Sequence, residues 1–146
     1  MGSLMMNISE IQTIEHDVLV VGAGGALGAM ARYALNVALQ RGANFPWGTL
    51  SANFLGCLII GVIAQLVASS EWFNNAGIIP DHYRLLFAVG FCGSFTTLSA
   101  LVLESHTMLQ RNEIFASFSY VLVSVAGGFA CFYAGFMLMR MFRGYA

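Results

Sequence analysis

The sequence predicts an all-α membrane protein with four transmembrane helices. Of the 146 residues, 58% are hydrophobic and only 9% are charged, whereas a soluble domain carries about 25% charged residues. The mean hydropathy of +0.75 agrees with this contrast. Four stretches with almost no charge match the length of about 20 apolar residues that crosses a bilayer. Such a chain has too few charges to cover a surface that faces water.

The four expected spans follow one another with short connections. The first contains Arg32, the third reaches Glu104 only near its end, and the other two carry no charge. We assign residues 17–143 to one four-helix transmembrane domain and residues 1–16 to a tail or an interfacial segment. The spans run over about 18–40, 49–68, 85–109 and 114–139.

A glycine cluster in the first span allows two interpretations. Residues 17–32 read DVLVVGAGGALGAMAR, which is similar to the strand and phosphate turn of a dinucleotide-binding domain. The strict fingerprint is G-x-G-x-x-G, but its third position here is Leu27. By contrast, Gly24 and Gly28 lie four residues apart, on one helix face, where small residues let membrane helices approach closely. The pattern therefore predicts helix packing.

The arginines are almost evenly divided between the two sides of the membrane. With four spans, Arg84, Arg140 and Arg143 lie on one side, and Arg41 and Arg111 lie on the other. The positive-inside rule therefore gives only a small bias. Charge alone leaves two alternatives open, insertion in both orientations or one orientation set by the two C-terminal arginines.

Polar residues inside the spans are candidate functional groups, because they are costly in lipid. Asn53 is either an interhelical hydrogen-bonding group or a donor directed into a pore. The run GFCGSFTTLSA at residues 90–100 predicts either a functional break in the third helix or a kink. Tyr120 and Ser124 lie four residues apart on one face. Arg32 and Glu104 are the charges within spans.

The histidines and cysteines show no metal-ligand pattern. The cysteines are odd in number, lie inside spans and include no C-x-x-C pair, which is typical of packing residues. No ligand spacing relates any two of the histidines, so we expect no metal at them. The histidines are His16, His82 and His106.

Three motifs in order identify a family resemblance. They are GGALGAMARY at residues 24–33, PWGTLSANFLG at 46–56 and GFCGSFTTLS at 90–99. The chain resembles the Fluc (CrcB) fluoride channels over about residues 18–141. The resemblance implies antiparallel, dual-topology dimers of four-helix subunits, with a broken third helix and two pores per dimer. It also implies a structural Na⁺ at the two-fold axis, held by the main-chain carbonyls of Gly93 and Thr96.

The resemblance also implies which side chains line the fluoride path. Fluoride is small and strongly hydrated, so a selective path must replace its water with hydrogen-bond donors. By position the path would be lined by Asn53, Leu98, Ser99, Leu101, Glu104, Tyr120 and Ser124, with Arg32 supplying positive potential near a pore entrance.

Four positions depart from the family pattern. The family usually reads TTFSxF after the glycines, and its two phenylalanines offer positive ring edges to an anion. Here these positions are Leu98 and Leu101, and leucine has no such quadrupole. In addition, Ala100 and Gly128 stand where the family has polar residues.

The expected function is passive fluoride export as a homodimer in a bacterial plasma (inner) membrane. One alternative is a small multidrug-type proton-coupled transporter, for which Glu104 is the candidate membrane-embedded glutamate. Another is a non-conducting subunit or one half of a heteromeric pair, which Leu98 and Leu101 favour. We find no nucleophile–base or metal constellation that predicts an enzyme.

Overall fold

The computed structural model describes residues 8–40, 44–68 and 80–144, and every regular element in these ranges is a helix. Within these ranges, four helical stretches are long and apolar enough to cross a membrane, which confirms the predicted all-α class with four spans. They are Gln12–Leu39, Trp47–Val67, Arg84–Gln110 and Ile114–Phe142. The elements are α1 (Ile8–Leu39), α2 (Trp47–Ala68), α4 (Pro80–Tyr83), η1 (Arg84–Cys92), α5 (Gly93–Phe95), α6 (Leu98–Gln110) and α7 (Ile114–Gly144).

The first helix begins earlier than the first span that the sequence predicts. Residues 8–16, which we assigned to a tail or an interfacial segment, are helical and continuous with the rest of α1. Residues 1–7 of that segment lie outside the described part of the chain. As a result, His16 and Asp17 are placed on a helix that runs into the membrane-spanning stretch.

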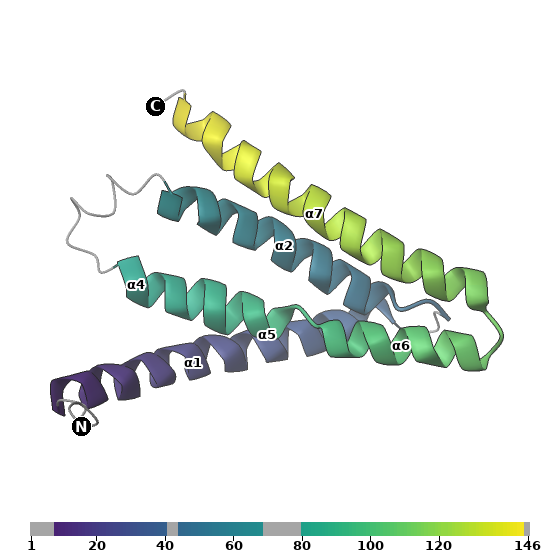
Figure 1. Ribbon diagram of the computed structural model, residues 1–146, viewed down its shortest axis with the longest axis horizontal. Coiled ribbons are helices and arrows are strands. Elements are labelled where there is room, and N and C mark those ends of the chain that lie inside the picture. The colour runs from purple at the N-terminus through teal and green to yellow at the C-terminus, as the bar shows by residue number, and fades with distance from the viewer. Residues whose placement is uncertain (1–7, 41–43, 69–79, 145–146) are drawn as a thin grey trace, which may run out of the picture.

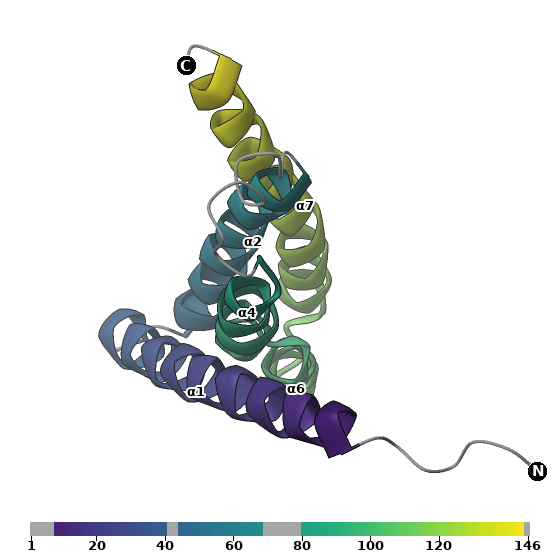
Figure 2. The same ribbon diagram turned by 90° about the vertical axis from the view of Figure 1, so that its left-hand side faces the viewer.

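The helices pack as two main pairs. The helix α2 lies along α7, and α1 lies along η1 and α5 (Figure 1). The end-on view in Figure 2 shows α1 on the side of the molecule away from α7. The third span, from α4 to α6, lies between α1 and the pair formed by α2 and α7, so it contacts both.

Glycines set the close approach between α1 and the third span. A Cβ atom on Gly24 would meet the backbone carbonyl of Leu86, and one on Gly28 would meet the carbonyl of Phe91. Facing them, a Cβ on Gly90 would lie 2.7 Å from the Val21 carbonyl oxygen. These glycines therefore serve helix packing, as their four-residue spacing predicts.

A second set of glycines brings α2 against α7. A Cβ on Gly61 would meet the Phe132 carbonyl, and a Cβ on Gly135 would meet the Leu58 carbonyl. The obstructing atoms are backbone, which cannot rotate away as a side chain does. The separation of α2 and α7 therefore depends on hydrogen being the only substituent at both positions.

The third span changes its backbone conformation along its length. In η1 the hydrogen bonds have the π-helical spacing, and Gly93 N–H still donates to the Ala88 carbonyl five residues earlier. After α5, Thr96 (φ −85°, ψ 155°) and Thr97 (φ −152°, ψ 121°) are extended. Helical geometry resumes at Leu98, where the Thr97 side chain accepts the Ala100 N–H and so caps α6.

Few of the described side chains are enclosed within the subunit. The buried cluster consists of Leu50, Leu101, Met108 and Tyr120, against which Phe45, Phe54 and Ala116 pack. Large apolar side chains point outward, and Phe115 is 86% exposed. This outward orientation of apolar side chains suits a protein surrounded by lipid, because contact between apolar groups and lipid tails carries no free-energy penalty.

The glycine packing generates a prediction about stability. We expect Gly61→Ala and Gly135→Ala each to destabilise the fold by about 1–3 kcal/mol, the usual cost of overpacking. The measurement is unfolding of the detergent-solubilised protein followed by circular dichroism. Gly22→Ala is the matched control, since no atom lies within 4 Å of the added Cβ. Equal stability of all three variants would contradict the packing role.

Candidate functional site

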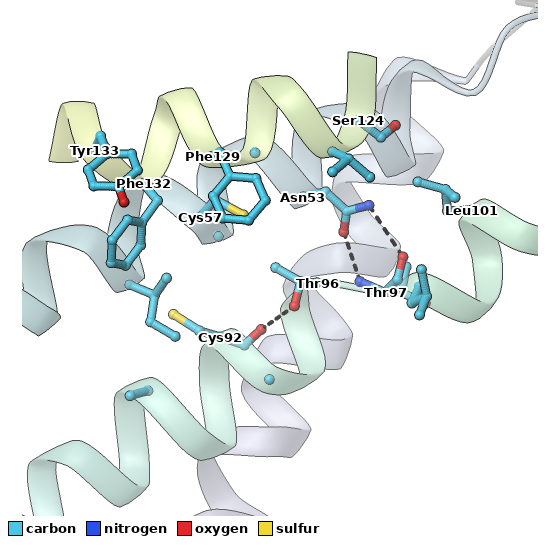
Figure 3. Close-up of a pocket in the computed structure, with 17 residues that line it drawn as sticks. Asn53, Cys57, Cys92, Thr96, Thr97, Leu101, Ser124, Phe129, Phe132 and Tyr133 are labelled. Carbon is cyan, nitrogen blue, oxygen red and sulfur yellow. Dashed lines mark hydrogen bonds between the residues drawn. The ribbon is translucent and has the colours of Figure 1, made fainter. Parts of the chain in front are cut away.

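A pocket of about 550 Å³ lies where α2 and α7 face the interruption of the third span (Figure 3). Its lining is mostly apolar and contains a small number of polar groups. Several residues that the sequence predicts for the site line it, namely Asn53, Gly93, Thr96, Leu98, Leu101 and Ser124. The pocket therefore joins the predicted positions from three different spans.

Asn53 holds the extended segment by two reciprocal hydrogen bonds. Its Oδ1 accepts the Thr97 N–H at 2.8 Å, and its Nδ2 donates to the Thr97 carbonyl at 3.3 Å (Figure 3). Asn53 thus forms interhelical hydrogen bonds, one of its two interpretations from the sequence, and its place in a pore stays a prediction. Because a primary amide has two N–H groups, one donor remains for a further acceptor.

At the interruption, two backbone N–H groups donate to side-chain oxygens and not to the carbonyls four residues earlier. In a continuous helix, the N–H of residue i+4 donates to the carbonyl of residue i. The Thr97 N–H donates to Asn53 instead of to the Gly93 carbonyl. Likewise, the Ala100 N–H donates to Thr97 Oγ1 instead of to the Thr96 carbonyl. Gly93 and Thr96 are the two residues whose carbonyls the sequence resemblance implicates in cation binding.

Two neighbouring carbonyl groups, those of Cys92 and Ser94, do accept hydrogen bonds. Cys92 O accepts both the Thr96 N–H at 3.0 Å and the Thr96 hydroxyl at 2.9 Å. Arg32 Nε donates to the Ser94 carbonyl at 3.1 Å. A cation placed at the carbonyl end of a helical segment is electrostatically favourable. Arg32 thus contacts the third span at its interruption, although it does not line the pocket.

Gly93 leaves open space on its exposed side. The nearest atom to a Cβ built there is the Ala88 carbonyl oxygen, at 4.0 Å. Oxygen ligands without competing donors suit hard cations, which bind carboxylate, carbonyl and water oxygen. The Gly93 and Thr96 carbonyls therefore fit the chemistry of a small hard cation such as Na⁺.

Glu104 lies outside this pocket, in a hydrogen-bonded group formed by three helices. Thr49 Oγ1 donates to its Oε1 at 2.7 Å, and the Tyr120 hydroxyl donates to its Oε2 at 2.6 Å. Both donors are almost fully buried. On its other side Glu104 borders a smaller pocket of about 200 Å³, which Arg111 also lines. The carboxylate therefore has a polar environment inside the span.

The two predicted polar residues of α7 have different surroundings. Tyr120 contacts Glu104, whereas Ser124 lines the large pocket. Ser124 is buried, and its Oγ has no hydrogen-bond partner among the described residues. A buried hydroxyl without a partner is costly, so Ser124 Oγ is available to a ligand that accepts or donates a hydrogen bond.

The two leucines that replace the family's phenylalanines also differ. Leu98 is 73% exposed at the edge of the pocket, whereas Leu101 is 5% exposed and belongs to the buried cluster. Ser99 does not line the pocket, and its hydroxyl lies 3.1 Å from Thr97 Oγ1. The aromatic side chains of the pocket come instead from α7, as Phe129, Phe132 and Tyr133.

Sequence reasoning missed Thr49 and Thr97. Thr49 precedes Asn53 by four residues, one helical turn, so the two share a face of α2. That spacing was a usable signal for a polar pair. Thr97 was hidden in the run of small polar residues at 90–100, where composition does not distinguish one hydroxyl from the next.

Comparisons with known proteins agree with these features. The family model described as "CrcB-like protein, Camphor Resistance (CrcB)" matches residues 19–136. The "fluoride-specific ion channel FluC" of Chlorobium phaeobacteroides (strain BS1) is 43% identical over 125 residues, which are 85% of this chain and 93% of that protein. The proteins of the same name from Prosthecochloris aestuarii and Chlorobaculum tepidum are 42% and 37% identical, over 93% and 97% of their lengths.

These names describe an ion channel and not an enzyme, and the matches extend through all four spans. With its four apolar helices, the protein is an integral membrane protein. The match to the family model covers most of the chain, and it includes all of the motifs on which the resemblance rests. The chain belongs to the CrcB-like family.

Proposed function

We propose that this protein is a fluoride-selective channel that lets F⁻ leave the cell passively across a bacterial plasma membrane. The observation that carries the proposal is the pocket at the interrupted third span. There the Asn53 amide and the Ser124 hydroxyl offer hydrogen bonding inside a largely apolar wall. The relatives that carry the name of a fluoride-specific channel match the chain across this region.

The donor set suits fluoride because the ion is small and holds its water strongly. A narrow path must offer the ion hydrogen bonds in place of the water that it removes. Transfer of an unpaired ion into an apolar medium costs a large free energy. Asn53 retains one N–H beyond the one that it donates to Thr97, and the Ser124 hydroxyl has no partner among the described residues. We place both on the fluoride path, with Leu98 and Leu101 as its apolar boundary.

The other predicted residues would act beside the path. Arg32, fixed to the Ser94 carbonyl, supplies positive potential near the interruption. Glu104 and Tyr120, together with Thr49 and Ser99, extend the polar groups toward the smaller pocket that Arg111 lines. This arrangement gives a series of hydroxyl groups along α2, α6 and α7.

A structural Na⁺ fits the carbonyls of Gly93 and Thr96. Both carbonyls have lost their helical donors, and Gly93 is exposed on the outside of the subunit. When bound, the ion would supply a fixed positive charge that lowers the cost of holding an anion in a medium of low dielectric constant. In this interpretation the interruption at Thr96 and Thr97 is the functional break of the third helix.

We further propose an antiparallel homodimer with two pores. The exposed position of Leu98 and of Gly93 leaves this edge of the subunit for a second copy. The near balance of arginines between the two sides supports insertion in both orientations. Two inverted copies would each contribute a pocket, and each pair of Gly93 and Thr96 carbonyls would meet its counterpart.

Of the alternatives, one gains support from a specific observation. Leu98 is exposed beside the pocket where the family has phenylalanine, which favours a heteromeric or non-conducting subunit. The transporter alternative is less favoured, since both oxygens of Glu104 already accept hydroxyl donors. Fluoride flux through the purified chain alone would favour the homodimeric channel over the heteromeric or non-conducting subunit.

The role of Asn53 is tested by fluoride efflux from liposomes. Vesicles loaded with fluoride are diluted into fluoride-free medium with a potassium shunt, and release is read with an electrode. We expect Asn53→Asp to reduce the flux at least about tenfold. The variant keeps the acceptor for Thr97 but replaces the amide donor by an anion, whose repulsion at 4 Å is about 4 kcal/mol at an effective dielectric constant of 20.

The matched control is Asn112→Asp, which makes the same charge change in the connection between α6 and α7. Asn112 has a φ of 61°, a conformation that aspartate also tolerates, so this variant should conduct as the wild type does. Undiminished flux in Asn53→Asp would remove Asn53 from the path. Wild-type release no faster than that from empty vesicles would refute the channel.

Leu98→Phe tests whether the missing aromatic edge limits the flux. We expect an increase of about two- to tenfold, equivalent to the 0.5–1.5 kcal/mol typical of aromatic interactions. Leu98 is 73% exposed in the single subunit, so no contact within the described part of the subunit opposes the larger ring. Leu103→Phe is the control, because Leu103 is 66% exposed on the same helix but lies outside the pocket lining. An identical flux for both variants would exclude this role for position 98.

Dual topology is tested by labelling from one side of the membrane. Glu113→Cys, in a chain whose own cysteines are replaced, places a thiol at an exposed position just before α7. A membrane-impermeant maleimide should label about half of the copies in sealed vesicles from the outside, as equal insertion in two orientations requires. Labelling of all copies or of none, with full labelling after permeabilisation, would show a single orientation.

A further inference from the structure

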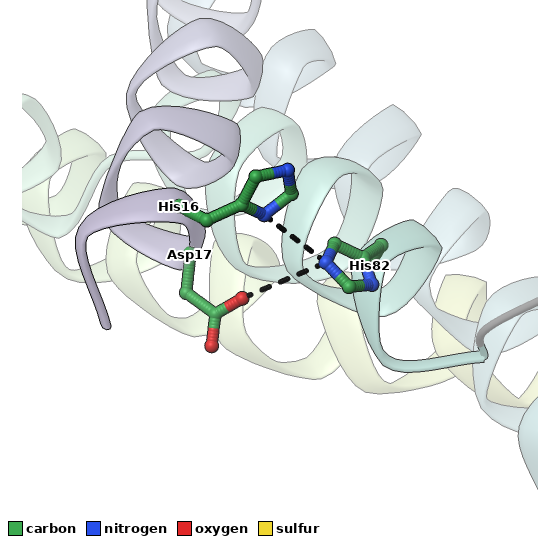
Figure 4. Close-up of side chains that lie close together, drawn as sticks. All are labelled: His16, Asp17 and His82. Carbon is green, nitrogen blue, oxygen red and sulfur yellow. Dashed lines mark hydrogen bonds and ion pairs between the residues drawn. The ribbon is translucent and has the colours of Figure 1, made fainter. Parts of the chain in front are cut away.

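Two histidines and an aspartate meet at the end of the molecule where α1 and α4 lie together (Figure 4). His16 Nδ1 and His82 Nε2 are 3.1 Å apart. His82 Nε2 and Asp17 Oδ1 are 3.9 Å apart, and one ligand atom from each residue lies within 4.8 Å of the others. No spacing rule links His16 with His82, which explains why we expected no metal at the histidines.

The separations match those between ligands of one metal ion. Zinc binds imidazole nitrogen at about 2.0–2.1 Å and carboxylate oxygen at about 2.0–2.2 Å. In a tetrahedron of that size, neighbouring ligand atoms are about 3.3–3.4 Å apart. The distance between the histidine nitrogens is already close to this value, and the Asp17 oxygen needs to approach His82 Nε2 by only about 0.5 Å.

The surroundings leave the ligand atoms available. The side chains of His82 and Asp17 are each 36% exposed, so the described part of the chain does not enclose them. The two rings meet edge to face, with centroids 4.7 Å apart. His82 Nδ1 is buried without a hydrogen-bond partner among the described residues. A neutral ring that carries its proton on Nδ1 presents the Nε2 lone pair to His16 and Asp17.

We propose that His16, Asp17 and His82 form a binding site for a divalent transition metal, with Zn²⁺ as the representative ion. Imidazole with one carboxylate is a ligand set that suits zinc, copper and nickel. Water completes the coordination, as in zinc sites that have three protein ligands. The ion would join α1 to α4, which leads directly into η1. This site is separate from the pocket at the third-span interruption, and it does not depend on fluoride conduction.

The test uses the full chain without a polyhistidine tag, purified in detergent and freed of metal with a chelator. Titration with Co²⁺ is followed by visible absorption, and titration with Zn²⁺ by calorimetry. We expect saturable binding of about one ion per chain. His16→Gln and His82→Gln should abolish it, and Asp17→Asn should weaken it at least about tenfold, comparable to losses of supporting contacts at zinc sites.

His106→Gln is the matched control, because His106 is exposed on α6 and belongs to no such cluster among the described residues. A second readout is thermal unfolding, since an ion that binds only the folded state raises the midpoint. Zn²⁺ should raise it for the wild type and His106→Gln but not for His82→Gln. Equal midpoints in chelator show that the variants fold. Binding that survives in the His16→Gln, His82→Gln double variant, or that does not saturate, would overturn the proposal.

Discussion

The reciprocal hydrogen bonds between Asn53 and Thr97 are the interaction on which the central region depends. An extended backbone within a membrane span exposes polar groups that lipid cannot satisfy. Asn53 supplies both an acceptor and a donor to Thr97, so the extended conformation is compensated from α2. The same contact withdraws the Thr97 N–H from the Gly93 carbonyl. One side chain thereby stabilises the interruption and determines which carbonyl is released.

Close packing of the helices is what allows Asn53 to reach the third span. Gly56 follows Asn53 by three residues on α2, and a Cβ atom on Gly56 would meet the Thr96 side chain. Gly61 and Gly135 hold α2 against α7, which brings Ser124 to the same pocket. Gly24 and Gly28 hold α1 against η1, so that Arg32 on α1 reaches the Ser94 carbonyl. Small residues thus position the polar ones, although they carry no chemistry themselves.

Sequence patterns predicted the features that depend on one segment of the chain. Hydrophobic length determined the four spans, and the polar run at 90–100 indicated where the third span changes conformation. Contacts between distant segments were not predictable in this way. Spacing does not connect His16 with His82 across 66 residues, and hydropathy does not indicate that Leu98 is exposed while Leu101 is buried. The contrast between Leu98 and Leu101 arises from the orientation of α6 after its cap at Thr97. That orientation depends on the tertiary structure.

The single face of α2 that carries Thr49 and Asn53 relates the two polar regions of the molecule. Thr49 donates to Glu104, and Asn53, one turn further, holds Thr97. Both partners belong to the third span, on α6 and on the extended segment before it. A helix is stiff over one turn, so a displacement of α2 relative to α6 would disturb both contacts together. The glutamate, although outside the large pocket, therefore helps to fix the register in which Asn53 meets the interruption.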